Sequence, residues 1–252
     1  MKAVILAGGE ATRLRPLSLE IPKPLIPVQG KSVMEYLVEN FFAFGCTEVL
    51  IVIKKKDVRR FFNWQLVYAS IHKINPQRIV LVAENEPMGT LGIFKEARFQ
   101  EALLKDNPEG DFFVTNADEL KDIDLKALYK LHKQKEAKAT IAMTKVTEKS
   151  SYGNVYYDDK FNKIYGFVEK KEAAGEDVQY ISTGLYCVSK DVLKFSEKYK
   201  EKKVMFETNL FPELAVRGEL FGYTHTGQFY PTDDFVKWED AIINYKYKTP
   251  RY

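Results

Sequence analysis

Residues 2–27 read KAVILAGGEATRLRPLSLEIPKPLIP. The apolar run at the start predicts a buried parallel strand over 3–7. This strand leads directly into two adjacent glycines, and Arg13 and Arg15 follow shortly after them. Glycines allow backbone N–H groups to approach an anion closely, arginine is a bidentate charged donor, and Lys23 adds a mobile point charge. This stretch therefore predicts a polyphosphate site at the end of the strand.

The first half of the chain alternates strand-like and helix-like segments. We expect strands over 48–53, 78–83 and 112–115, and helices over 33–44, 58–68 and 93–103. Such alternation predicts a parallel sheet with right-handed crossovers, in which ligands bind at the carboxyl ends of the strands. Gly8, the segment 84–89 and Asp118 all fall at such ends, so we expect them to converge.

The second half is richer in strand-like segments separated by turns. We expect strands over 139–145, 153–157, 163–169, 182–188 and 221–224, and helices over 125–134, 191–199, 210–217 and 238–242. No repeat or Pro-rich linker is visible, which predicts one compact domain over 1–252. The predicted fold class is α/β: a Rossmann-like, mixed but mostly parallel sheet flanked by helices in three α/β/α layers.

Composition excludes several functional classes. The net charge of +3 gives no general field for nucleic acid, and the apolar runs are far too short to span a membrane. Cys46 and Cys187 are too few and too scattered for a disulfide framework or a metal knuckle, and no signal peptide is visible, so a cytoplasmic protein is expected. Basic stretches such as 54–56 and 197–203 are interpreted as solvated surface.

The opening stretch resembles the signature of the sugar-phosphate nucleotidylyltransferases, LAGGxGTRLRPLT followed by PKPLxPV. The matching residues are Gly8, Gly9, Thr12, Arg13, Leu14, Arg15, Pro16, Leu17, Pro22, Lys23, Pro24, Leu25, Pro27 and Val28. The resemblance extends more thinly to about Gly222 and implies a Mg²⁺-dependent attack of a sugar 1-phosphate oxygen on the α-phosphorus of an NTP, giving an NDP-sugar and pyrophosphate. It also implies a mainly nucleotide-binding half over 1–120 and a mainly sugar-binding half over 121–252.

The resemblance assigns nucleotide contacts to both ends of the first half. The implied nucleotide-binding residues are Leu6, Ala7, Gly8, Gly9, Glu10, Ala11, Thr12, Arg13, Glu84, Pro87, Gly89 and Thr90. Arg13 is expected to stabilise the leaving pyrophosphate, and Lys23 to contact the reacting phosphates, both as catalytic residues. One departure is Ala11, which replaces the second loop glycine of the family. If this position needs φ > 0, alanine is strained by ~1 kcal/mol or more; if it does not, the methyl group merely narrows the loop.

The segment 84–92 resembles the family's base-recognition loop, which commonly ends PxGTAG. Its residues are most similar to those of the guanylyltransferases and some uridylyltransferases of the family. This similarity favours GTP or UTP as the donor and a mannose-, heptose- or glucose-type 1-phosphate as the acceptor. An ordinary Pro-x-Gly turn after a strand is the alternative reading.

Two carboxylates are implied as Mg²⁺ ligands. Asp118 ends a buried strand as the family's GD motif does, with a helix or turn cap as the alternative. For the second ligand, alignment on the closing helix puts Pro231 at the family's usual Asp. Asp233 or Asp234 could supply the charge from the next turn; Asp233 is preferred, with an N-cap for that helix as its alternative.

The implied sugar-phosphate residues are Asn116, Gly153, Glu169, Lys170, Thr183 and Gly184, with Gly184 in a turn beside the sugar ring. Lys171 replaces the family's proline after this Glu-Lys pair, and Ser182 replaces a usual Asn, so the pattern of sugar hydroxyls recognised can differ.

Two other functions stay open from the sequence. One is a non-catalytic nucleotide- or sugar-phosphate-binding regulatory protein of the same fold, and the other is a transferase with an acceptor such as phosphocholine. The expected partners are an NTP and a sugar 1-phosphate, with no nucleic acid and no membrane. The chain ends soon after the core, so no C-terminal β-helix is expected. A homo-oligomer is left open, because small members of the family often associate.

Overall fold

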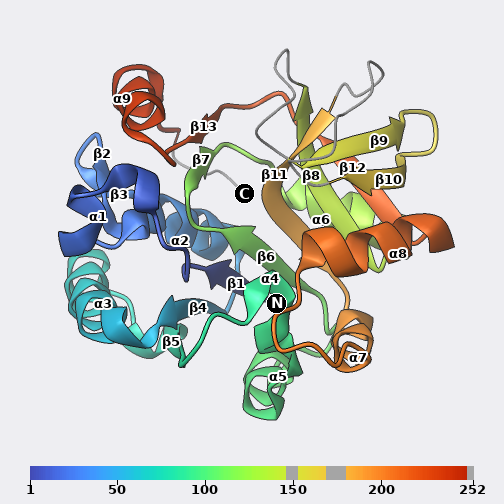
Figure 1. The fold of residues 1–252 in the computed structure, drawn as a ribbon, viewed down its shortest axis with the longest axis horizontal. Helices are drawn as coiled ribbons and strands as arrows, with labels where there is room; N and C mark the ends of the chain where they lie inside the picture. Colours follow the sequence, from blue (N-terminus) through green and yellow to red (C-terminus); the bar gives the residue numbers. More distant parts are fainter. Residues whose placement is uncertain (146–152, 169–179, 249–252) are drawn as a thin grey trace. The chain divides into compact units, whose positions relative to one another are not determined.

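A computed structural model describes residues 1–145, 153–168 and 180–248 (Figure 1). The chain forms two compact units, and each is described by itself. The first unit comprises Met1–Pro87, Thr115–Asp122 and Gly227–Tyr252, and the second comprises Met88–Val114 and Ile123–Thr226. The division of labour expected between residues 1–120 and 121–252 stays a prediction.

The first unit is built on three parallel strands in the order β5-β4-β1. These are β1 (Lys2–Leu6), β4 (Glu48–Lys54) and β5 (Ile79–Glu84), which confirm the three strands expected there. The apolar residues of β1 and β4 are almost completely buried, because a parallel sheet is covered on both faces. The polar loops that follow these strands are thereby held on a rigid support.

Helices and short hairpins complete the first unit. They are η1 (Thr12–Leu14), α1 (Leu17–Glu20), η2 (Lys23–Leu25), β2 (Pro27–Val28), β3 (Lys31–Ser32), α2 (Val33–Phe44), η3 (Lys55–Asp57), α3 (Val58–His72), η4 (Pro76–Arg78), β7 (Glu119–Lys121), β13 (Phe229–Pro231) and α9 (Phe235–Asn244). The bounds of α2 follow directly from the sequence. Ser32 and Glu35 form a capping box at its start, and Gly45, with φ of 103°, ends it.

The second unit carries the remaining elements. They are α4 (Gly89–Gly92), η5 (Ile93–Lys95), α5 (Ala97–Leu104), β6 (Phe112–Asn116, which ends in the first unit), α6 (Leu125–Gln134), β8 (Ala139–Lys145), β9 (Asn154–Asp158), β10 (Lys163–Val168), β11 (Tyr180–Val188), α7 (Asp191–Glu197), the π-helix η6 (Phe206–Leu210), α8 (Phe211–Arg217) and β12 (Leu220–Thr224). The strands β11, β8, β12, β10 and β9 pair in that order, and β9 also pairs with β11. They therefore close into a ring in which β12–β8 is the parallel pair and the other pairs are antiparallel.

The mixed α/β class is confirmed, with its parallel strands concentrated in the first unit. The single helix expected over 93–103 is wrong. Glu96 has an extended backbone, with ψ of 118°, and separates η5 from α5. No helix among residues 1–145, 153–168 and 180–248 combines the length and apolar character needed to cross a bilayer.

Candidate active site

The predicted phosphate loop begins where β1 ends. The backbone N–H of Ala7 still donates to the Val52 carbonyl of the neighbouring strand (2.8 Å), and beyond it the chain leaves the sheet. A Cβ atom on Gly8 would lie 3.2 Å from Oε2 of Glu84, at the end of β5. The structure therefore brings Gly8 and Glu84 together, as expected for residues at the carboxyl ends of neighbouring strands.

Ala11 adopts a left-handed backbone conformation, with φ of 49° and ψ of 39°. Its carbonyl accepts hydrogen bonds from the backbone N–H of Leu14 (3.1 Å) and the hydroxyl of Ser18 (2.8 Å), which hold the turn. Neither Gly8 nor Gly9 has a positive φ. The loop position that needs glycine's conformational freedom is therefore occupied by Ala11. Of the two alternatives given above, the first holds: the alanine backbone is strained, at a cost of ~1–2 kcal/mol.

Lys23 and Asp118 meet beside this loop. Nζ of Lys23, in η2, lies 2.9 Å from Oδ2 of Asp118, and the lysine side chain is 10% exposed. Asp118 caps no helix, since the next helix along the chain, α6, is capped by Asp124. The carboxylate instead faces a nearly buried cation.

Asp233 is the second carboxylate of this cluster. Its Oδ2 accepts a hydrogen bond from Nη1 of Arg13 (2.6 Å), and its Oδ1 accepts one from Nζ of Lys237 (2.8 Å). Burial raises the pKa of Asp233, but the hydrogen bond from Lys237 and the charges of Lys237 and Lys23 outweigh it, so the pKa lies below its usual range. Asp233 is therefore ionised at neutral pH.

The backbone brings the two carboxylates onto adjacent segments. The backbone N–H and hydroxyl of Thr232 both donate to the Asp118 carbonyl (2.9 and 3.0 Å), next to the antiparallel pairing of β13 with β7. Asp234, and not Asp233, is the N-cap of α9, because its Oδ1 accepts from the backbone N–H of Lys237 (2.9 Å). The cap role proposed as the alternative for Asp233 is thus taken by its neighbour.

This donor set fits a magnesium ion that arrives with a phosphorylated substrate. Within the part of the chain that the structure describes, no three His, Cys, Asp or Glu side chains gather to form a metal site of their own. Mg²⁺ is commonly held by one or two carboxylates together with substrate phosphates and water. Asp118 and Asp233, each now facing a cation, are carboxylates of this kind.

Comparison with known proteins identifies the family of this chain. A family model described as "Nucleotidyl transferase" matches residues 2–241. The chain belongs to the nucleotidyl transferase family. It is 35% identical over 223 residues to mannose-1-phosphate guanyltransferase beta-B of Xenopus laevis, covering 88% of this chain and 58% of the relative. It is also 35% identical over 228 residues to a probable mannose-1-phosphate guanylyltransferase 1 of Oryza sativa subsp. japonica, covering 90% and 60%.

A solved structure shares the fold. HddC from Yersinia pseudotuberculosis aligns with a TM-score of 0.71 and 26% identity, over 96% of this chain and 98% of HddC, and a second HddC structure is a complex with GMP-PN. Length differs among these relatives. The chain spans about 60% or less of the two curated relatives but nearly all of HddC.

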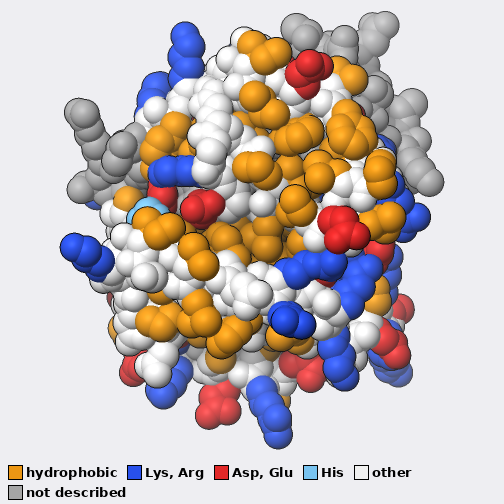
Figure 2. All heavy atoms as spheres, turned by 90° about the vertical axis from the view of Figure 1, so that its left-hand side faces the viewer, with side chains coloured by type: hydrophobic (Ala, Val, Ile, Leu, Met, Phe, Trp, Pro, Cys, Tyr) orange, Lys and Arg blue, Asp and Glu red, His pale blue; other side chains and the backbone are white. Residues whose placement is uncertain are grey.

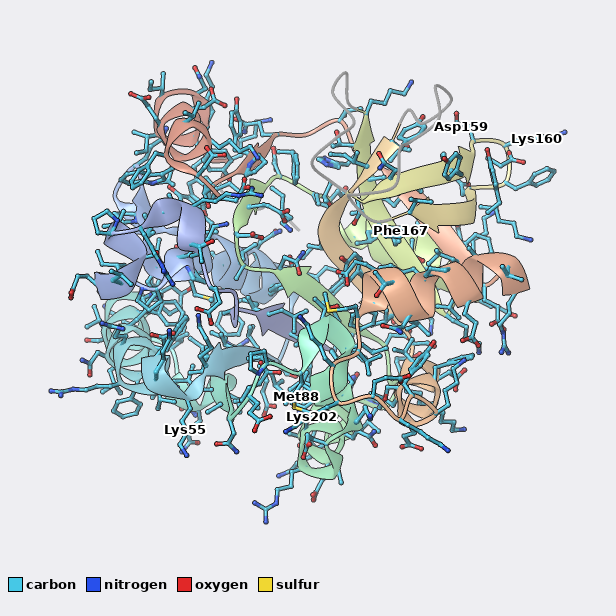
Figure 3. The ribbon with its side chains drawn as sticks, viewed as in Figure 1. Lys55, Met88, Asp159, Lys160, Phe167 and Lys202 are labelled. Carbon is cyan, nitrogen blue, oxygen red and sulfur yellow. The ribbon has the colours of Figure 1, made fainter. Side chains whose placement is uncertain are left out.

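In this nucleotidyl transferase, the end of the segment expected to recognise the base is fixed by contacts within the second unit. Gly89 has φ of 80°, and a Cβ atom there would lie 2.4 Å from the Val204 carbonyl oxygen. The Thr90 hydroxyl donates to Oε2 of Glu207 (2.6 Å) and accepts from the backbone N–H of Phe206 (2.9 Å). Figure 3 shows Met88, which precedes this turn, beside Lys202, which lies two residues before Val204. Glu84 and Pro87 belong to the first unit.

The residues expected around the sugar are only partly described. The Gly153 carbonyl accepts from the backbone N–H of Ser182 (2.9 Å), and the buried Thr183 hydroxyl donates to the Ala142 carbonyl (2.8 Å). The turn expected at Gly184 is wrong: Gly184 lies inside β11, where φ of 65° accompanies an irregularity in the pairing with β8. Asn116 is the last residue of β6, and Glu169 and Lys170 lie outside the described residues.

The sequence interpretation missed Lys54. Its Nζ donates to the Gly9 carbonyl (2.7 Å) and lies 3.3 Å from Oε1 of Glu10, and its side chain is 15% exposed. Solvated surface is therefore the wrong reading of Lys54, although Lys55 does point outward (Figure 3). The position of Lys54 at the end of β4, beside β1, was the available signal, because residues at that edge face the loop.

Proposed function

We propose that the protein is a sugar-1-phosphate nucleotidylyltransferase that joins GTP to a mannose-type hexose or heptose 1-phosphate. A phosphate oxygen of the sugar 1-phosphate attacks the α-phosphorus of GTP, and the bond from that phosphorus to the bridging oxygen of pyrophosphate breaks. The observation that carries this proposal is the pair of ion pairs beside the phosphate loop, Lys23–Asp118 and Arg13–Asp233. Two cations and two carboxylates gathered at such a loop suit an anionic transition state with a magnesium ion.

The residues take separate roles in this proposal. The loop from Leu6 to Thr12 binds the triphosphate, Arg13 stabilises the departing pyrophosphate, and Lys23 holds the reacting phosphates in line. Asp118 and Asp233 would hold Mg²⁺, which would neutralise charge on the phosphates. Lys23 and Arg13 are each paired with a carboxylate in the structure. In the proposal, the substrate phosphates replace these carboxylates as the partners of the two cations.

The remaining implied residues complete the two substrate sites. The residues proposed for base recognition are Glu84 and Pro87 in the first unit and Gly89 and Thr90 in the second, where the Thr90 hydroxyl donates to Glu207. The sugar-phosphate site comprises Asn116, Gly153, Glu169, Lys170, Thr183 and Gly184. The preference for guanine and a mannose-type sugar is supported by the names of the curated relatives and by the GMP-PN complex of HddC.

A substrate panel tests the proposal. The protein is incubated with each NTP and a set of hexose and heptose 1-phosphates, with Mg²⁺ or with EDTA, and pyrophosphate release is measured. We expect release with GTP and a mannose-type 1-phosphate and none with EDTA. No release from any pair, with a folded protein by circular dichroism, would contradict the proposal. GTP binding without turnover would favour the regulatory alternative, and release with phosphocholine would change the acceptor.

A further inference from the structure

The first unit exposes an unusual number of large apolar side chains on α3. Phe62, Leu66, Val67 and Ile71 are between 46% and 67% exposed. They stand on the side of α3 opposite the buried Phe61 and Tyr68, so they do not belong to the unit's own core. An apolar surface of this kind on a folded protein marks an interaction site.

The same face continues over two other helices. Leu19 of α1 is 56% exposed, and Val236 and Ile243 of α9 are 75% and 69% exposed. Arg60 of α3 donates to the Leu19 carbonyl (3.2 Å), which joins α1 to α3. In Figure 1, α9, α1 and α3 follow one another along the same side of the first unit, and Figure 2 shows hydrophobic side chains gathered on this side.

The charges on this face are divided between its two outer helices. α3 carries Arg59 and Arg60 near its start and no acidic residue over Val58–His72. On α9, Glu239 and Asp240 are exposed and lie between Val236 and Ile243 at helical spacing, so they share a surface with those apolar residues. One outer helix is thus apolar and basic, and the other is apolar and acidic.

This division makes the face complementary to itself. A two-fold rotation about an axis through the middle of the face exchanges its two ends, so that the basic helix of one copy meets the acidic helix of the other, twice. We infer that two copies of this chain associate through the face formed by α1, α3 and α9, with α3 of each copy against α9 of the other. A lipid surface fits less well, because Glu239 and Asp240 would be buried against anionic headgroups.

The inference does not rest on the proposed function, because it uses no residue of the phosphate site. The test measures mass in solution by sedimentation velocity over 1–100 μM, an experimental range chosen for roughly micromolar association. The expected result is a dimer for the unmodified chain. Arg59→Glu and Glu239→Arg each place like charges together twice per dimer, so each variant alone is expected to raise the dissociation constant tenfold or more.

A mixture of the two variants gives the decisive result. In a mixed pair, the glutamate at position 59 faces the arginine at 239, and Arg59 of the second variant faces Glu239 of the first, so both contacts are restored. We expect the mixture to form a heterodimer at concentrations where each variant alone is mostly monomeric. Val216→Asp, at a side chain of α8 that is 88% exposed in the other unit, serves as the matched control and should leave the dimer intact.

Three outcomes would overturn the inference. They are a monomeric unmodified chain across the whole concentration range, a dimer that neither charge reversal weakens, and two weakened variants that fail to associate when mixed. Circular dichroism of each variant shows that the monomers are folded. A monomer would leave the face to another partner, such as a further segment of a longer chain.

Discussion

Lys23 and Asp118 are separated by 95 positions in the chain, yet Nζ of Lys23 lies 2.9 Å from Oδ2 of Asp118. The lysine is the first residue of η2, between Pro22 and Pro24, and the aspartate follows β6, so two separate segments of the first unit meet at this ion pair. Because the lysine side chain is nearly buried, its charge is poorly screened by water and acts strongly on any group placed beside it.

Removing either charge of this pair should abolish most of the turnover. We expect Lys23→Met and Asp118→Asn each to lower kcat by ~100-fold or more, because in the proposed mechanism each group acts on charge that develops during the reaction. Steady-state pyrophosphate release measures the effect. Asp122→Asn is the matched control, since Asp122 is in the same segment but pairs with Lys248 at 3.4 Å. Full activity of Asp118→Asn would remove Asp118 from the catalytic cluster.

Ala11→Gly should make the protein more stable. Ala11 has φ of 49°, where glycine avoids the steric cost that alanine bears, so the free energy of unfolding should rise by up to ~1 kcal/mol. Urea denaturation provides the measurement. The comparison is Ala102→Gly in α5, where glycine in a helix should lower the same quantity by ~1 kcal/mol. An equal loss of stability in both variants would show that the left-handed turn carries no strain.

Lys54→Met should weaken nucleotide binding more than it slows the reaction. Lys54 holds the Gly9 carbonyl and the Glu10 carboxylate, and the hydrogen bond from Lys54 is the main reason that the pKa of Glu10 is lowered. Its loss should loosen the loop and raise the KM for the NTP by ~10-fold with a smaller change in kcat. Lys55→Met, at an outward-pointing side chain, is the control (Figure 3). Equal effects of the two substitutions would count against a loop-holding role.

Local patterns predicted most of the fold because each carries its own physical cause. Ser32, Glu35 and Gly45 determine where α2 begins and ends, and the apolar run of β4 has the composition of a strand buried on both faces. Such features are readable without knowledge of the rest of the chain. The break at Glu96 was missed because 93–103 keeps its apolar spacing across an extended residue.

The site was predictable in its residue types but not in its pairings. The sequence indicated Arg13, Lys23, Asp118 and Asp233. The pairing of β13 with β7, which places the two carboxylates on adjacent segments, and the two ion pairs themselves are long-range contacts with no local signal. The role of Lys54 was hidden in the same way, because a run of three lysines is usually surface. The conformation of Ala11 was left open, since a positive φ at a non-glycine residue depends on surrounding hydrogen bonds.

Stability should fall as the pH rises through neutrality because of Glu119. Burial raises the pKa of this carboxyl to about 7 from 4.5, although Lys121 lies 2.8 Å away and opposes the shift. The folded protein thus binds the proton more tightly than the unfolded chain, so the stabilising contribution is complete below pH 4.5 and is lost as the pH passes about 7. Urea denaturation measures the free energy of unfolding of the unmodified protein and of Glu119→Gln at several pH values over this range. The unmodified protein should lose ~1–3 kcal/mol relative to the variant as the pH rises, because only the glutamate titrates. A constant difference would contradict the raised pKa.

Asp233 and Asp234 should separate into a catalytic and a structural residue. Asp233 faces Arg13 and Lys237 through its side chain, whereas Asp234 caps α9 through the backbone N–H of Lys237. We expect Asp233→Asn to lower kcat by ~100-fold with little change in unfolding, because it removes charge from the phosphate cluster. Asp234→Ala should cost ~1 kcal/mol of stability, as the loss of an N-cap does, and should keep most of the activity.

Pyrophosphate release and urea denaturation of both variants are measured side by side. The reverse pattern, with activity lost at Asp234 and stability lost at Asp233, would contradict the assignment of Asp233 as the second carboxylate and favour Asp234 in its place.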